Sequence, residues 1–146
     1  MRKLQWLVSG VAIVGVLTAA CGGDGRTREE YLKEANAVCD QLNTAREETA
    51  PKFFPSEAQP PTLQQLQSFY AAFGPQFSRS INQLADIKPS KGDAAEINQL
   101  IDNAKDHAEV ILEAGRDSAV AQRLLATDEA ELHTDDEAMS KFGYKC

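Results

Sequence analysis

Few side chains in this chain of 146 residues could carry covalent or metal chemistry. They are three cysteines, Cys21, Cys39 and Cys146, and two histidines, His107 and His133. The cysteines form no CxxC motif, and a reactive thiol needs a neighbouring group that lowers its pKa. A zinc site needs three or four ligands at defined spacing; a free Cys39, His107 and an acid could in principle assemble one, but this is not the favoured interpretation. We therefore favour a structural role over a reactive one for Cys39 and Cys146, and we predict no catalytic residue and no metal site.

Other short motifs likewise give no support for a metal site or an enzyme. HAE at residues 107–109 matches half of the zinc-deaminase signature, but no PCxxC follows it. TDDE at residues 134–137 lacks the glycine and the length of a calcium-binding loop. We interpret the acidic band on the third predicted helix as a solvated face; its members are Asp102, Asp106, Glu109 and Glu113. GxSxG and phosphate-binding glycine loops are absent, so we predict no enzyme activity and no cofactor.

The N-terminus has the three parts of a secretory signal. Arg2 and Lys3 precede an uncharged, mostly apolar run at residues 4–20, and this run ends in small residues just before Cys21. The run is at the lower edge of the ~17–25 residues that span a bilayer. Processing is the favoured interpretation, and a permanent transmembrane anchor is the alternative.

LTAACGG at residues 17–23 resembles the lipobox of bacterial lipoprotein precursors, although Thr18 stands where leucine is commonest. In such precursors the cysteine receives a diacylglyceryl group, and a signal peptidase cuts just before it. The resemblance implies a signal peptide at residues 1–20 and a lipid attachment site at Cys21 with a flexible tether through residue 26. The protein would then be held on the extracytoplasmic face of the cell membrane. Ordinary cleavage, leaving Cys21 free or disulfide-bonded, is the alternative.

Lipidation of Cys21 would leave Cys39 and Cys146 as a pair in a compartment where disulfides persist. Their bridge would close a segment of 108 residues, counted from 39 to 146 inclusive. The chain-entropy model gives about 4–5 kcal/mol for loops of this size. We therefore expect one structural disulfide that joins the first helix to the last residue.

The charge of the chain argues against nucleic acid as a partner. Residues 1–20 contain two of the 15 basic residues and none of the 22 acidic ones, so their removal changes the net charge from −7 to −9. Nucleic-acid-binding domains carry a basic patch instead. The 126 residues left after this removal are consistent with one domain.

The apolar spacing predicts an all-α fold. The first helix begins at Thr27, with Glu30 at capping-box spacing, and ends before a proline-rich linker at residues 49–62. The second helix begins near Thr62, with Gln65 at the same spacing. Its apolar phase continues across a proline, where we expect a kink or a short break.

The third helix is expected to be the longest, within residues 88–126, with Leu125 in its inner stripe and Gly115 loosening its middle. A short final helix follows at residues 134–143, with Gly143 as its C-terminal cap. We thus predict a small bundle of three main helices plus a short C-terminal helix, over residues 27–146 and stapled by one disulfide.

Four aromatic residues recur at helical spacing in the second helix: Phe69, Tyr70, Phe73 and Phe77. Such a stripe could line a groove for an apolar ligand. At this spacing it is more often part of the core, which is the interpretation we favour.

YLKEANAVC at residues 31–39 and FGYKC at residues 142–146 resemble the two ends of uncharacterised small actinobacterial helical lipoproteins. This resemblance implies the Cys39–Cys146 bridge and a helical fold, but no activity. We therefore expect a non-catalytic binding or accessory module of the cell envelope, tethered to the membrane through its N-terminal diacylglycerol. It would recognise an envelope protein or a small apolar ligand. A structural or stress-related envelope protein without a specific ligand is the alternative, and an enzyme is the least favoured class.

Overall fold

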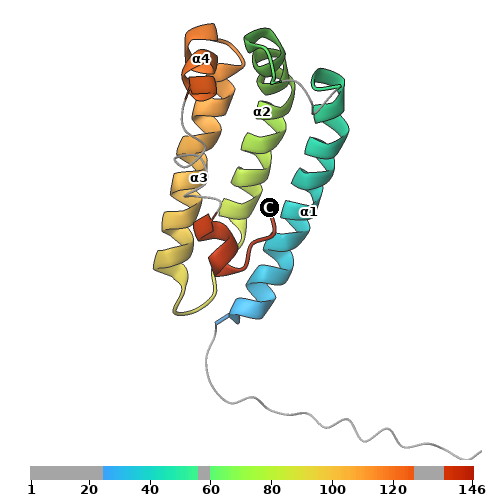
Figure 1. The fold of residues 1–146 in the computed structure, drawn as a ribbon. Helices are drawn as coiled ribbons and strands as arrows, with labels where there is room; N and C mark the ends of the chain where they lie inside the picture. Colours follow the sequence, from blue (N-terminus) through green and yellow to red (C-terminus); the bar gives the residue numbers. More distant parts are fainter. Residues whose placement is uncertain (1–24, 56–59, 127–136) are drawn as a thin grey trace, which may run out of the picture.

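The computed structural model describes residues 25–55, 60–126 and 137–146, and Figure 1 shows their arrangement. These residues form an all-α bundle, which confirms the predicted fold class. The described helices are α1 (Arg28–Phe53), α2 (Leu63–Asp86), α3 (Ala94–Ala114), α4 (Ser118–Ala126) and a short C-terminal helix at residues 137–142. The predicted signal peptide and Cys21 lie outside the described residues.

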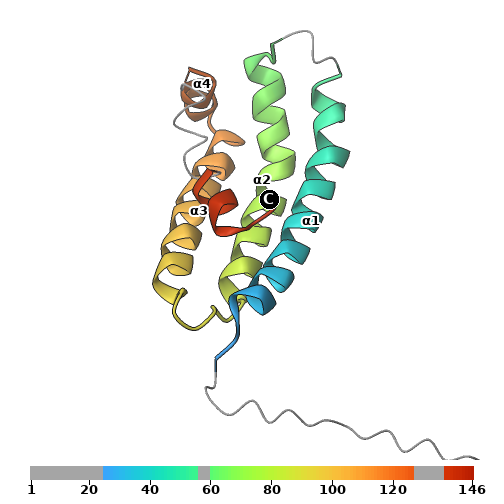
Figure 2. The same ribbon diagram turned by 60° about the horizontal axis from the view of Figure 1, so that its bottom comes forward.

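The three long helices lie side by side, with α2 in the middle (Figures 1 and 2). Helix α2 packs against both α1 and α3, whereas no Cα atom of α1 lies within 8 Å of one in α3. Both views place the C-terminal segment, residues 137–146, over α2 and between the two outer helices. This segment therefore completes a core that three helices alone would leave open.

Both predicted capping boxes are present. The Thr27 hydroxyl accepts from the Glu30 amide at 3.2 Å, and the Glu30 carboxylate accepts from the Thr27 amide at 2.9 Å. Thr62 and Gln65 make the same exchange at 3.2 and 2.9 Å. Each box satisfies two amides that would otherwise lack a partner at the helix start.

Two prolines lie inside helices. Helix α1 continues through Pro51 to Phe53, so the prediction that the linker begins at residue 49 was wrong. Helix α2 continues through Pro75 without a break, one of the two alternatives expected there beside a kink. Proline removes one hydrogen bond from a helix, but Phe73 before Pro75 and Phe77 after it both pack in the hydrophobic clusters. Tertiary packing thus offsets the local cost.

The prediction of one long third helix was also wrong. Helix α3 ends at Ala114, and a turn separates it from α4. A Cβ on Gly115 would lie 2.7 Å from the Ala71 Cα and amide nitrogen, so this turn approaches the α2 backbone closely. Asp117 then accepts from the Ala119 amide at 2.7 Å and begins a new helix. Because α4 takes a new direction, Leu125 is 47% exposed instead of facing the core.

The C-terminal helix ends as predicted. Gly143 has φ of +121°, a conformation that favours glycine, and both its amide and that of Tyr144 donate to the Met139 carbonyl at 3.1 Å. This cap turns the chain back towards α1. No described helix has the length and apolar character needed to cross a membrane.

Candidate functional site

The C-terminal segment is bound to α1 by side chains that recognise its backbone. Asn36 donates to the Gly143 carbonyl at 3.2 Å and accepts from the Lys145 amide at 2.9 Å. Asn43, two helical turns further along α1, donates to the Lys145 carbonyl at 2.8 Å. The residues after Gly143 are in neither a helix nor a strand, so their backbone groups have no regular partners. The two asparagines supply hydrogen-bond partners for the backbone of Gly143 and Lys145.

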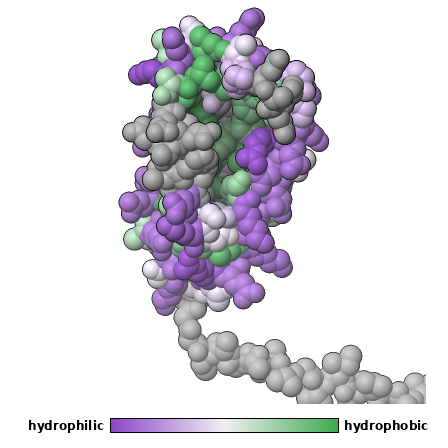
Figure 3. Space-filling view, viewed as in Figure 1, coloured by the Kyte–Doolittle hydropathy of each residue, from purple (hydrophilic) through white to green (hydrophobic). Residues whose placement is uncertain are grey.

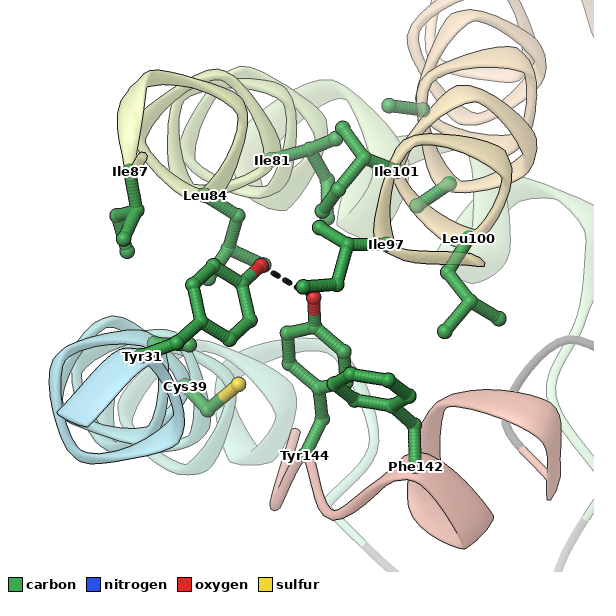
Figure 4. Close-up of a cluster of buried hydrophobic side chains, with 13 residues drawn as sticks. Tyr31, Cys39, Ile81, Leu84, Ile87, Ile97, Leu100, Ile101, Phe142 and Tyr144 are labelled. Carbon is green, nitrogen blue, oxygen red and sulfur yellow. Dashed lines mark hydrogen bonds between the residues drawn. The ribbon is translucent and has the colours of Figure 1, made fainter. Parts of the chain in front are cut away.

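Two aromatic rings of this segment enter the core, as Figure 4 shows. Phe142 and Tyr144 are 4% and 3% exposed, and the Tyr144 hydroxyl is hydrogen-bonded to that of Tyr31 on α1. Burial raises the pKa of Tyr31, and burial together with the hydrogen bond raises that of Tyr144. Arg28 covers the Phe142 ring, with its guanidinium carbon 3.9 Å from the ring centre, and donates to the Phe142 carbonyl at 2.9 Å.

The Cys39–Cys146 disulfide fixes the end of the segment to α1, with the two Cα atoms 4.4 Å apart. This confirms the predicted staple. Cys39 is fully buried, whereas Cys146 is exposed. The two sulfur atoms of the bridge therefore belong to residues of very different accessibility.

A cavity of about 270 Å³ lies where α1, α2 and α3 meet this segment. The helices contribute Leu42, Phe77, Ile81, Ala104 and His107, and the segment contributes Met139, Ser140, Tyr144, Lys145 and Cys146. Figure 3 shows a hollow on this face with hydrophobic residues at its base. Apolar side chains thus dominate the helical side, and polar groups lie mainly on the segment.

The predicted aromatic stripe divides between core and cavity. Phe69 and Phe73 are 9% and 6% exposed, and their rings stack with centres 5.2 Å apart in a cluster with Leu42. Tyr70 is partly buried and packs towards α4. Of the four, Phe77 lines the cavity, where the edge of its ring meets His107 with centres 6.1 Å apart.

The described residues considered for metal or catalytic chemistry form no candidate metal site. Cys39 is in the disulfide, His107 lines the cavity, and His133 lies outside the described residues. In the part of the chain that the structure describes, no three His, Cys, Asp or Glu side chains are grouped so that they could hold a metal ion. All four acidic residues of the band on α3 are exposed. One of them, Asp102, forms a surface ion pair in which its Oδ1 lies 3.8 Å from the Lys105 Nζ.

Sequence reasoning missed the polar side of this site. Asn36 and Asn43 are seven residues apart, so they share one face of α1, and this spacing was a usable signal. Met139, Ser140 and Lys145 gave no such signal, because only the folded chain brings them to the cavity. Comparison with known proteins found no match to any protein-family model, curated protein or solved structure.

Proposed function

We propose that this protein is a lipid-anchored extracytoplasmic binding module whose cavity holds a small apolar molecule. The cavity of about 270 Å³ between the helical layer and the C-terminal segment is the observation that carries this proposal. Small-molecule sites are typically concave and mostly apolar, with a few polar groups that orient the ligand. The lining has this composition.

The size of the cavity indicates the size of the ligand. An apolar cavity of about 150 Å³ holds benzene, so a cavity of about 270 Å³ suits a molecule of roughly 10–12 non-hydrogen atoms. A bicyclic aromatic compound or a medium-length acyl chain has this size. One polar group on the ligand could face His107, Ser140 or Lys145 at the edge of the cavity.

Binding is favoured over catalysis by the surroundings of the polar groups. A nucleophile or general base is oriented by a second group within hydrogen-bond reach. The ring contact of His107 is with Phe77, which is apolar. The Tyr144 hydroxyl is already occupied by Tyr31. The lining therefore offers surfaces for contact, and we assign no enzyme activity to it.

The proposed location rests on the N-terminal sequence and on the disulfide. The positively charged start, the apolar run and the lipobox-like LTAAC at residues 17–21 support export and attachment to a membrane through diacylglycerol at Cys21. A structural disulfide is typical of oxidising compartments outside the cytoplasm. The acidic surface gives no support for nucleic acid as a partner.

Titration with 2-naphthol and with decanoate tests the binding function, using the protein as a bacterial host processes it. We expect at least one of these probes to bind saturably and to raise the melting temperature. Ser140→Trp places an indole at the cavity and should abolish binding. Lys141→Trp puts the same ring on the neighbouring exposed position outside the lining, and should retain it. Absence of binding, or equal loss in both variants, would contradict the proposal.

A further inference from the structure

We propose that the Cys39–Cys146 disulfide controls access to the cavity, and that a dithiol reductant opens it. The inference rests on the proposed function, because it concerns regulation of the same cavity. Half of the lining residues belong to the C-terminal segment, and Cys146 itself is one of them. Oxidation state and cavity shape are therefore linked through a single short piece of chain.

The segment is the wall of the cavity that can leave without dismantling the helical layer. Helices α1 and α3 each pack on α2, and no Cα atom of one lies within 8 Å of the other. The segment bridges the space between them, as Figure 2 shows. If it detached, the apolar surface of Phe77 and Ile81 would face solvent, and a ligand would lose half of its contacts.

The two cysteines of the disulfide differ in exposure. Cys146 is exposed and Cys39 is fully buried, so we expect an incoming thiolate to attack the Cys146 sulfur rather than that of Cys39. A mixed disulfide forms at Cys146, and Cys39 leaves as a thiolate that takes up a proton. The second thiol of the reductant then attacks the reductant's other sulfur, which is bonded to Cys146 in the mixed disulfide. This step releases the Cys146 thiol. Cys39 and Cys146 together gain two electrons and two protons, and the dithiol becomes a disulfide.

Noncovalent contacts alone hold the reduced segment weakly. Its anchors are two buried rings, Phe142 and Tyr144, together with the hydrogen bonds from the asparagines, Tyr31 and Arg28 of α1. Ordering every residue of the segment costs conformational entropy. This cost is comparable in size to the free energy that these contacts contribute. The disulfide shifts this balance because it keeps the chain end beside α1.

If the oxidation state of the disulfide changes ligand affinity, then ligand binding must also change the reduction potential of the disulfide. A ligand that binds the oxidised protein tenfold more tightly than the reduced protein must lower the midpoint potential of the disulfide by about 30 mV at saturation. A filled cavity should also slow attack at Cys146, because that residue lines it. The bound ligand and the reductant thus oppose each other.

The test measures probe affinity and amide exchange in the two oxidation states of the processed protein. We expect reduction with dithiothreitol to weaken 2-naphthol or decanoate binding at least tenfold, and reoxidation to restore it. Exchange of the Tyr144 and Lys145 amides, which are hydrogen-bonded in the docked segment, should accelerate at least tenfold. Exchange of the Ile81 amide, in the buried core of α2, should accelerate less than that of the Tyr144 and Lys145 amides, because the helical layer stays folded. Cys146→Ser without reductant should reproduce the reduced behaviour.

The two readouts separate this inference from the proposed function. Equal affinity in both states with unchanged Tyr144 exchange overturns the redox control and leaves the binding function intact. Acceleration of the Ile81 amide equal to that of the Tyr144 and Lys145 amides on reduction also overturns it, because the bundle would then unfold as a whole. If neither probe binds in either state, the binding function fails. In that case accelerated exchange confined to residues 142–145 supports the release of the segment, and unchanged exchange refutes it.

Discussion

The Tyr31 and Tyr144 hydroxyls form a hydrogen bond inside the core, although the two residues are 113 positions apart in the sequence (Figure 4). Their rings meet edge to face, with centres 6.0 Å apart. The pair joins the first turn of α1 to the end of the chain, and the disulfide joins Cys39, about two turns further along α1, to the last residue. The position of the C-terminal segment therefore depends on several contacts that are remote in sequence.

Removing the second hydroxyl of this pair should cost less once the first is gone. Tyr144→Phe leaves the Tyr31 hydroxyl buried without its partner, and we expect a loss of about 1–3 kcal/mol in unfolding free energy. The double replacement by phenylalanine should be less destabilising than the sum of the single ones. Urea unfolding of the four proteins measures this coupling. Additive losses would show that the hydrogen bond contributes nothing specific.

Alkaline pH should destabilise the protein through its buried tyrosines. Burial raises the pKa of Tyr31, Tyr70 and Tyr144 in the folded state, so the unfolded chain releases their protons first. The unfolded state then binds fewer protons than the folded state, and stability falls as the pH rises above the ordinary tyrosine pKa of about 10. Urea unfolding between pH 8 and 11 tests this. Tyr144→Phe should reduce the slope, and an unchanged slope would be evidence against the assignment.

Two glycines should respond oppositely to alanine. A Cβ on Gly115 would lie 2.7 Å from the Ala71 backbone, so Gly115→Ala should lower the unfolding free energy by about 1–3 kcal/mol. A Cβ on Gly74 would meet Ile111 and Leu112 at 3.4 Å, an ordinary contact distance. Gly74→Ala should therefore be neutral or stabilising, because alanine is the better helix former. Equal melting temperatures for both variants would rule out the close approach at Gly115.

Loss of the disulfide should destabilise the whole domain as well as free the segment. We expect Cys146→Ser to lower the unfolding free energy by about 2–5 kcal/mol, since the bridge closes most of the described chain. Chemical denaturation with and without reductant measures the effect in the parent protein. The variant should show no further loss on reduction. A reductant-dependent loss in Cys146→Ser would mean that another thiol pair contributes.

The helices could be predicted because their signals are local. Both capping boxes involve residues three positions apart, and the apolar stripe of α2 repeats along one face. The break after α3 could not, because it depends on contact between Gly115 and the backbone of Ala71, 44 positions earlier. A glycine in a helical pattern does not reveal whether another helix passes beside it.

The candidate site was predictable only in part for the same reason. The cysteine count gave the bridge, which in turn placed the end of the chain on α1. The cavity combines side chains from four separate pieces of chain, and its polar edge comes from Ser140 and Lys145, which no spacing rule connects to Phe77. Phe69 and Phe73 share a face with Phe77 but lie two turns and one turn nearer the start of α2, where they pack in a buried cluster instead of lining the cavity.

The methyl signal of Met139 tests the central claim most directly. Met1 and Met139 are the only methionines, and Met139 lines the cavity. In the processed protein with labelled methionine methyls, we expect 2-naphthol or decanoate to shift the Met139 signal saturably and to give nuclear Overhauser contacts to it. A probe that binds without affecting this methyl, or two probes that do not bind at all, would contradict a ligand site in this cavity.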